Sequence, residues 1–407
     1  MQLPWRMPAE WHPASAIWLA WPHKTDTWPG HFENVPPFFA RLAVEIARTH
    51  PVWIVADKSL VPSATELIRR QIDGDPSSGT QALMEIRFLE TPTDDCWIRD
   101  YGPVFTLPHL LLPETSGELL PATSGEVSAA TPSGDARDAA VPLSAVHFRF
   151  NAWGGKYQHF QRDAAAGPRI ADHVSARLIE SPLCAEGGAL ETDGNGRLLV
   201  CETTLVGPTR NPGMSKEAIA EELYRTLGVT EIVWLGESDP SDSGSNEIGH
   251  KESSGEDANA PPISGDDTDG HIDQLARFLD PYTVVVATAD HRHGPSQLSL
   301  QKIRRQLITW GRQTEPAVTV IDLPMPAPRF IDGQAVPQSY CNFLRLGPDR
   351  ILMPTFRDRE ADAGALDILR GALPTCQIDP VDCFDLAWGL GALHCASLHQ
   401  PAVTITG

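Results

Sequence analysis

Apolar and polar residues follow two patterns that alternate along the chain. Short apolar runs bounded by turn residues predict buried strands, and apolar positions three or four residues apart predict helices. The predicted strands span residues 16–20, 51–56, 84–89, 146–150, 229–235, 282–289, 318–323, 340–346, 350–354 and 375–378. The predicted helices span residues 36–49, 63–72, 169–179, 215–228, 296–312 and 360–373. This alternation is compatible with an α/β fold.

Local signals mark the ends of several elements. Ser215 is an expected N-cap, and Gly228 is expected to end the same helix. The Asp-Gly and Asn-Gly pairs at 193–196 predict the turn of a β-hairpin. Leu298 is one of the apolar positions assigned to the buried face of the helix at 296–312. Glu186 stands before two glycines, where the backbone is free to bring its carboxylate into a site.

Two tracts interrupt the regular pattern. Residues 115–140 and 237–265 are rich in Ser and Gly and lack periodicity, which predicts surface insertions. The chain has a net charge of −21; the two tracts carry −3 and −6, which leaves −12 for the remainder. An acidic protein of this kind is not expected to bind nucleic acid, and its charge is compatible with a small cationic partner.

The cysteines indicate a reducing compartment. All seven are scattered without CxxC spacing, which is typical neither of a disulfide framework nor of a zinc site. The N-terminus lacks a signal-peptide pattern, and no stretch approaches 18 uninterrupted apolar residues, so neither secretion nor a membrane partner is expected. We therefore predict a cytoplasmic protein in which a cysteine is free to act as a reagent.

The stretch 265–280 concentrates chemically active groups. If it continues as a strand after Gly270, His271 and Asp273 share one face and can supply a proton shuttle and an anchor for a cation. An acidic, solvated turn is an equally good interpretation of this stretch alone. A calcium loop is excluded, because Gly265 and Ala276 occupy the positions that require Asp and Glu.

A second candidate loop surrounds Trp97. Asp94, Asp95, Arg99 and Asp100 crowd around this tryptophan between turn residues, which is more typical of a binding loop than of a packed element. A carboxylate beside a flat indole can hold a planar cation by charge-assisted hydrogen bonds and stacking. The alternative is a structural network in which one of these aspartates pairs with Arg99.

The C-terminal segment contains the third candidate. A helix is expected to begin at 382–386, and residues 392–396 are expected to form a short strand that places Cys395 near a loop. Neighbouring side chains on a strand face opposite ways, so His394 is not expected to be the base for Cys395. That base should come from elsewhere in the fold.

Six motifs in this order resemble one family. They are WIRDYGP, FNAWGGKY, EGGALETDGNG, RNPGMSKE, DTDGHIDQ and GALHCASLHQP. They resemble the agmatine deiminase family, which is related to bacterial peptidylarginine deiminases within the guanidine-modifying superfamily. The resemblance covers nearly the whole chain except the two insertions. It implies a single domain, 1–407, with the fold of a five-fold pseudo-symmetric α/β propeller (pentein type) built from ββαβ units around a central site.

The resemblance also implies roles for individual residues. Cys395 takes the position of the nucleophile, His271 that of the general acid and base, and Glu186 that of the carboxylate beside the histidine. Asp100 and Asp273 take the two positions that clamp the guanidinium. The chain departs from the family at Leu390-Gly391-Ala392, where Gly-Gly-Asn is common, and this change concerns contacts to the substrate tail.

The same resemblance implies a substrate and a reaction. The expected reaction is hydrolysis of agmatine to N-carbamoylputrescine and ammonia through a thiouronium intermediate, in polyamine biosynthesis, with no metal and no cofactor. Trp97 is expected to form a pocket wall, and Asp267 is a candidate for the amine end of the substrate. A homodimer is possible.

Four alternatives to this function stay open at this point. They are deimination of another guanidine such as peptidyl-arginine or free arginine, a cysteine hydrolase acting on amides, metal-dependent hydrolysis around His271, and non-enzymatic polyamine binding.

Overall fold

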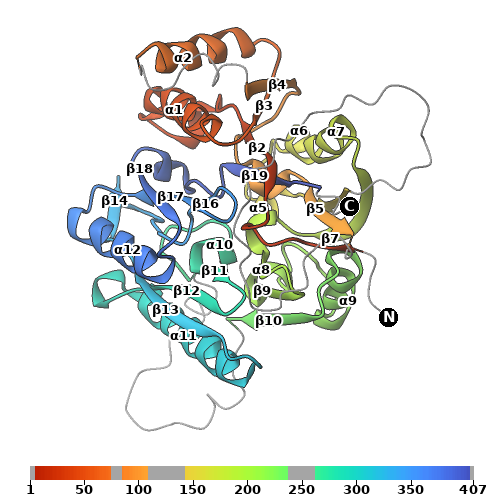
Figure 1. The fold of residues 1–407 in the computed structure, drawn as a ribbon, viewed down its shortest axis with the longest axis vertical. Helices are drawn as coiled ribbons and strands as arrows, with labels where there is room; N and C mark the ends of the chain where they lie inside the picture. The colour runs from red at the N-terminus through yellow and green to blue at the C-terminus, as the bar shows by residue number, and fades with distance from the viewer. Residues whose placement is uncertain (1–4, 75–84, 109–142, 237–261, 404–407) are drawn as a thin grey trace.

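The computed structural model describes residues 5–74, 85–108, 143–236 and 262–403 (Figure 1). The predicted insertion at 115–140 lies outside the described residues, as does all of the second insertion except 262–265. No helix in these ranges is long and apolar enough to cross a membrane.

Five mixed sheets repeat one pairing pattern. In each, a middle strand pairs antiparallel with one neighbour and parallel with the other. The first two sheets contain β5 (Val104–Pro108), β6 (Ser144–Arg149) and β7 (Arg177–Cys184), and β8 (Glu191–Thr192), β9 (Arg197–Cys201) and β10 (Glu231–Leu235). The next two contain β11 (Ala276–Asp280), β12 (Thr283–Thr288) and β13 (Thr319–Pro324), and β16 (Leu344–Arg345), β17 (Arg350–Thr355) and β18 (Gln377–Asp382). The fifth contains β19 (Ser397–Pro401), β2 (Ala14–Ala20), β3 (Val52–Ala56) and the added β4 (Ile86–Glu90).

Two smaller pieces complete the strands of the described residues. The short β1 (Trp5–Arg6) extends the first sheet beside β5. A separate hairpin joins β14 (Arg329–Ile331) to β15 (Gln334–Val336). Figure 1 shows the five sheets arranged around the short helix α10 (Ile272–Leu275), and within the described residues they remain separate sheets. The α/β class predicted from the sequence is confirmed.

Long helices cover the outer side of the sheets (Figure 1). They are α1 (Val35–Ala47), α2 (Val61–Gly74), α7 (Ala166–His173), α9 (Lys216–Leu227), α11 (Pro295–Gln313) and α12 (Arg359–Ala372). α11 contacts β12 and β13, α12 contacts β18, and α1 contacts β3 and β4. Short helices lie near the sheet ends: α4 (Ile98–Tyr101), α5 (Ala152–Gly155), α6 (Gln161–Ala164) and α8 (Glu202–Leu205).

The capping signals of α9 are confirmed. Ser215 Oγ accepts a hydrogen bond of 3.2 Å from the backbone N–H of Ala218, and Gly228 ends the helix with a left-handed φ of 66°. In α11, however, the buried apolar residues include Leu300, while Leu298 is 70% exposed. Two residues along a helix turn the side chain by about 200°, so these two leucines cannot share a face.

Several predicted boundaries are wrong. The helix expected to begin at 382–386 does not form, because β18 runs to Asp382 and only the 3-10 helix η8 (Leu386–Gly389) follows. The helix expected at 169–179 ends at His173, because the chain turns and residues 177–184 pair with β6 instead. Of the strand expected at 340–346, only Leu344–Arg345 pairs. Residues 392–396 form turns, and the strand begins at Ser397, where pairing with β2 starts.

Candidate active site

The candidate site residues occupy equivalent places in the five sheets. Each stands shortly before the strand that pairs antiparallel with the middle strand of its sheet: Asp100 before β5, Glu186 before β8, His271 and Asp273 before β11, and Cys395 before β19. The fourth sheet contributes Asn342 before β16, a residue that sequence reasoning missed. The approach of the five sheet ends therefore assembles the site from segments far apart in sequence.

The strand predicted for His271 and Asp273 is wrong. His271 is the N-cap residue of α10, and Asp273 lies in its first turn. Their side chains nevertheless converge on Gly188, together with Asp100. A Cβ atom at Gly188 would lie 2.6 Å from His271 Nδ1, 2.8 Å from Asp100 Oδ1 and 3.0 Å from Asp273 Oδ2. Only glycine fits at this position, which explains one of the two glycines after Glu186.

Cys395 lies buried between an amide and a carboxylate. Asn342 Nδ2 donates to its sulfur at 3.1 Å, and Sγ lies 3.4 Å from Asp273 Oδ2. Asn342 Oδ1 also accepts from the backbone N–H groups of His394 and Cys395 at 3.1 and 3.3 Å, which fixes this turn. Burial, together with Asp273 and Asp100, raises the pKa of the Cys395 thiol well above its usual value. Without a cation in the site, the sulfur therefore holds its proton.

His271 lies between two carboxylates. Its Nδ1 is 3.6 Å from Asp100 Oδ1 and its Nε2 is 3.6 Å from Glu186 Oε2. Both ring nitrogens are buried without a hydrogen-bond partner. Burial alone lowers the pKa of His271, but Asp100, Glu186 and Asp273 outweigh it and raise the pKa to about 9. The imidazole is therefore charged at neutral pH and can act as an acid.

Glu186 forms a buried ion pair with Arg210 through the carboxylate oxygen that does not face His271. Arg210 Nε donates to Glu186 Oε1 at 2.9 Å, and its Nη2 donates to the Thr268 carbonyl at 2.9 Å. Burial raises the pKa of Glu186, but the neighbouring His271 and the charge of Arg210 outweigh it, and the pKa lies below its usual value. Arg210 opens the RNPGMSKE motif, so the signal was present in the sequence although no role was assigned to it.

The carboxylate of Asp100 accepts hydrogen bonds from an indole N–H and a backbone N–H. Trp153 Nε1 donates to Oδ2 at 2.9 Å, and Gly188 N donates to Oδ1 at 3.1 Å. Burial raises the pKa of Asp100 to about 7. The negative charges of Asp273 and Glu186 add to this rise, and His271 opposes it. Trp153 and Gly154 have φ values of 54° and 88°, so the chain turns tightly at the paired glycines of FNAWGGKY.

The loop around Trp97 has two uses. Asp100 faces His271, whereas Arg99 forms a buried ion pair of 3.0 Å with Glu10. Asp95 accepts hydrogen bonds from Thr27 Oγ1 and from the backbone of the next residue at 2.7 and 2.8 Å. Asp100 therefore faces His271, while Arg99 pairs with Glu10 and not with an aspartate of its own loop, so the predicted structural network is wrong in its partner.

A cavity of about 350 Å³ leads to the thiol. Trp97, Asp100, Asp267 and Cys395 are among its lining residues. The Trp97 ring packs against Gly391 so closely that a Cβ there would lie 2.6 Å from it. Tyr157 also lines this cavity, and its Oη donates to Asp267 Oδ2 at 2.6 Å. The structure therefore brings every site residue predicted from the sequence to the wall of this cavity or directly behind it.

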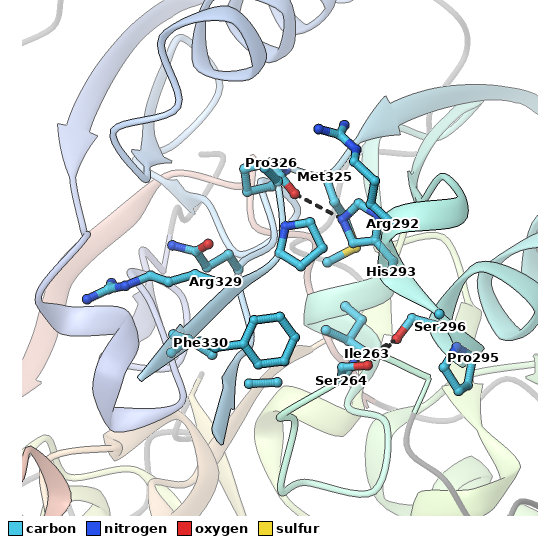
Figure 2. Close-up of a pocket in the computed structure, with 16 residues that line it drawn as sticks. Ile263, Ser264, Arg292, His293, Pro295, Ser296, Met325, Pro326, Arg329 and Phe330 are labelled. Carbon is cyan, nitrogen blue, oxygen red and sulfur yellow. Dashed lines mark hydrogen bonds between the residues drawn. The ribbon is translucent and has the colours of Figure 1, made fainter. Parts of the chain in front are cut away.

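A second cavity, of about 290 Å³, differs in its chemistry (Figure 2). Its lining contains neither a carboxylate nor a cysteine. Figure 2 shows apolar side chains such as Phe330 and Met325 around it, while the guanidinium groups of Arg292 and Arg329 extend outward. A guanidinium ligand has no counter-ion there, so this cavity is not a candidate active site. Within the described residues, no group of three or more His, Cys, Asp or Glu side chains is placed to hold a metal ion.

Comparisons with known proteins agree with this geometry. The model of the family described as Porphyromonas-type peptidyl-arginine deiminase matches residues 6–248 and 259–401. A Vibrio parahaemolyticus protein named "Putative agmatine deiminase" is 28% identical, over 97% of this chain and 96% of its own. The solved agmatine deiminase of Enterococcus faecalis is 24% identical with a TM-score of 0.74, covering 98% of this chain and 97% of its own, and shows the same fold. The chain therefore belongs to the Porphyromonas-type peptidyl-arginine deiminase family.

Proposed function

We propose that this protein hydrolyses agmatine to N-carbamoylputrescine and ammonia, a step in polyamine biosynthesis. One observation carries the proposal: a buried thiol contacts one carboxylate and lines the same cavity as a second, with a charged histidine beside both carboxylates. The residues concerned are Cys395, Asp100, Asp273 and His271. The names of the relatives support agmatine as the substrate.

The two aspartates fit the guanidinium. This group is planar and carries its N–H donors in a fixed fork, so carboxylates on two edges hold its central carbon still. Asp273 Oδ1 is buried without a hydrogen-bond partner, and Asp100 Oδ1 lies 3.6 Å from His271 Nδ1. A bound guanidinium satisfies both carboxylates and places its carbon beside the Cys395 sulfur.

The cation also prepares the nucleophile. A positive charge between Asp100 and Asp273 offsets the negative field that raises the pKa of Cys395. The thiolate then attacks the guanidinium carbon, and His271 protonates the departing ammonia. The neutral imidazole next takes a proton from the water that hydrolyses the thiouronium, and Glu186 holds the ring through both steps.

The outer part of the cavity suits an alkyl ammonium. Trp97 offers an apolar wall to the methylene chain, and Asp267 and Tyr157 line the same cavity. We assign Asp267 to the amine end of agmatine. Burial raises the pKa of Asp267, and a bound ammonium would oppose that shift.

We also infer that the five sheets form a five-fold pseudo-symmetric propeller. The support is that they share one pairing pattern and that each supplies a site residue just before the strand antiparallel to its middle strand. The cytoplasmic location and the homodimer stay predictions.

The test compares guanidines directly. Ureido product and ammonia are measured from agmatine, free arginine and a peptidyl-arginine, with wild-type protein and Cys395→Ser in parallel and a chelator present. We expect turnover of agmatine alone, lost in the variant and unaffected by the chelator. If free arginine or the peptide were turned over faster, that compound and not agmatine would be the substrate. If no guanidine were turned over, the proposed function would be overturned.

A further inference from the structure

Leu390 has a backbone conformation that suits glycine. It follows the last residue of η8 with φ 70° and ψ 19°, in the left-handed region. A residue with a Cβ is strained in this region, whereas glycine adopts it freely. The backbone N–H of Leu390 donates to the Ala387 carbonyl at 3.0 Å, which holds the turn. The chain therefore carries a large side chain at a position where the backbone disfavours one.

The two neighbours of Leu390 are glycines for a different reason. A Cβ at Gly389 would lie 2.4 Å from the Trp28 ring, and a Cβ at Gly391 would lie 2.6 Å from the Trp97 ring. Neither of these glycines has a left-handed φ. Packing thus excludes a side chain on both sides of Leu390, while the one position of the three that favours glycine by its φ holds leucine.

Core packing does not explain this leucine. Leu386 and Leu393 in the same segment are buried members of the main hydrophobic cluster. Leu390 is partly exposed, and among the described residues it belongs neither to the buried clusters nor to the partly buried side chains packed on them. Its side chain therefore adds little to the stability of the folded protein.

Leu390 lines the active-site cavity instead, together with Trp97 and Cys395. Among the described residues of this lining, it is the one Leu, Ile, Val or Met. The next residue, Gly391, packs on the Trp97 ring, so the leucine adjoins the aromatic wall of the cavity. An aliphatic side chain in a lining that is otherwise mostly aromatic, polar or charged is suited to contact a hydrocarbon part of a ligand.

We propose that Leu390 is a specificity-determining residue that contacts the hydrocarbon chain of the substrate. This inference rests on the proposed function for the guanidinium held by Asp100 and Asp273. It adds a substrate class, namely guanidines that carry a plain alkyl chain of several methylene groups. Burial of those methylenes against Leu390 offsets the backbone strain only in the complex, so the leucine stabilises the bound state and not the empty protein.

The first test measures binding without turnover. Methylguanidine, n-butylguanidine and agmatine are titrated by calorimetry into Cys395→Ser protein, with and without the second substitution Leu390→Gly. We expect Leu390→Gly to weaken binding of n-butylguanidine and agmatine about 10-fold, because both have a four-carbon chain, and binding of methylguanidine by less than about 2-fold. Unchanged affinity for n-butylguanidine would overturn the proposal. An equal loss for all three ligands would also overturn it, because the effect would then lie at the guanidinium.

Urea unfolding separates a contact with the substrate from support of the core. Leu390→Gly removes a strained side chain, so we expect its unfolding midpoint to stay near that of the parent protein or to rise. A clear fall would assign Leu390 to the core and overturn the proposal. Ser175→Gly is the matched control, because Ser175 also has a left-handed φ, of 54°, and does not line the cavity. It should bind all three guanidines as the parent protein does, and a matching loss of affinity for n-butylguanidine would overturn the proposal.

Leu390→Asn tests the apolar character of the contact. Asparagine tolerates the left-handed region and is close to leucine in size. We expect this variant to lose affinity for n-butylguanidine as Leu390→Gly does. Affinity equal to that of the parent protein would overturn the proposal.

Turnover distinguishes this inference from the proposed function. With Cys395 present, Leu390→Gly should raise KM for agmatine about 10-fold, and this rise should account for most of the loss in kcat/KM. If wild type turns over no guanidine while the calorimetry shows the expected dependence on chain length, the proposed function fails and the contact stands. If agmatine is turned over and Leu390→Gly binds it as tightly as the parent protein, only the inference about Leu390 fails. If no guanidine binds, both are overturned.

Discussion

At the residue scale, the site holds two histidines with opposite proton affinities. Three carboxylates raise the pKa of His271 to about 9, whereas burial with Arg277 and Arg99 lowers the pKa of His394. At neutral pH the ring of His271 is therefore an acid. A deimination needs such an acid at its start, because the leaving nitrogen must gain a proton.

The raised pKa of His271 makes stability fall with pH. Unfolded histidine titrates near 6.5, so between about 6.5 and 9 the folded protein holds a proton that the unfolded chain has lost. The contribution is complete below about 6.5 and disappears as pH rises through 9. We expect the free energy of unfolding in urea to decline across this window in wild type, and to decline less in His271→Gln. The exposed His291→Gln should follow wild type, and equal slopes in all three proteins would contradict the raised pKa.

At the element scale, the turn η4 (Gly187–Ala189) must approach the site without a side chain. In Gly188→Ala the new methyl group would meet His271, Asp100 and Asp273 at 3.0 Å or less. We expect an activity loss of about 100-fold or more and a destabilisation of about 1–3 kcal/mol, measured by agmatine turnover and urea unfolding.

Gly364→Ala in α12 is the matched control. A Cβ there meets nothing within 4 Å, and alanine favours a helix, so we expect a gain of about 0.5–1 kcal/mol with unchanged turnover. Full activity in Gly188→Ala would mean that the three side chains are not held as tightly as their contacts indicate.

Elements with a complete local signal were predictable. The α9 helix carries its apolar spacing and both caps in one stretch of sequence, and its bounds were confirmed. The turn at 392–396 was predicted as a strand, because its conformation depends on Asn342, which binds two backbone amides from 52 and 53 residues away. Leu298 was misplaced because spacing alone cannot tell which of two leucines at i and i+2 meets the sheet.

At the scale of the whole molecule, site residues that lie in local motifs could be predicted, whereas contacts between residues far apart in sequence could not. Cys395, His271, Asp100 and Glu186 lie in recognisable motifs, and the structure brings them together. The contact of His394 with Glu10 joins residues 384 positions apart, and nothing in either local sequence indicates the other. Such pairs become visible only when the sheets are placed, since close contacts between distant segments follow from the fold.

The fifth sheet unites the two ends of the chain, because β19 pairs with β2. Leu398 on β19 is buried and packs against Gly102, where a Cβ would lie 2.7 Å from its Cδ2. In Leu398→Ala we expect a loss of about 2–4 kcal/mol in urea unfolding, together with lower turnover because Cys395 directly precedes the strand. Leu298→Ala removes the same atoms from a side chain that is 70% exposed, and should stay within about 0.5 kcal/mol of wild type. If the two leucine variants were equally stable, the C-terminal strand would not belong to the common core, and the position of the nucleophile would depend on the turn at Asn342 alone.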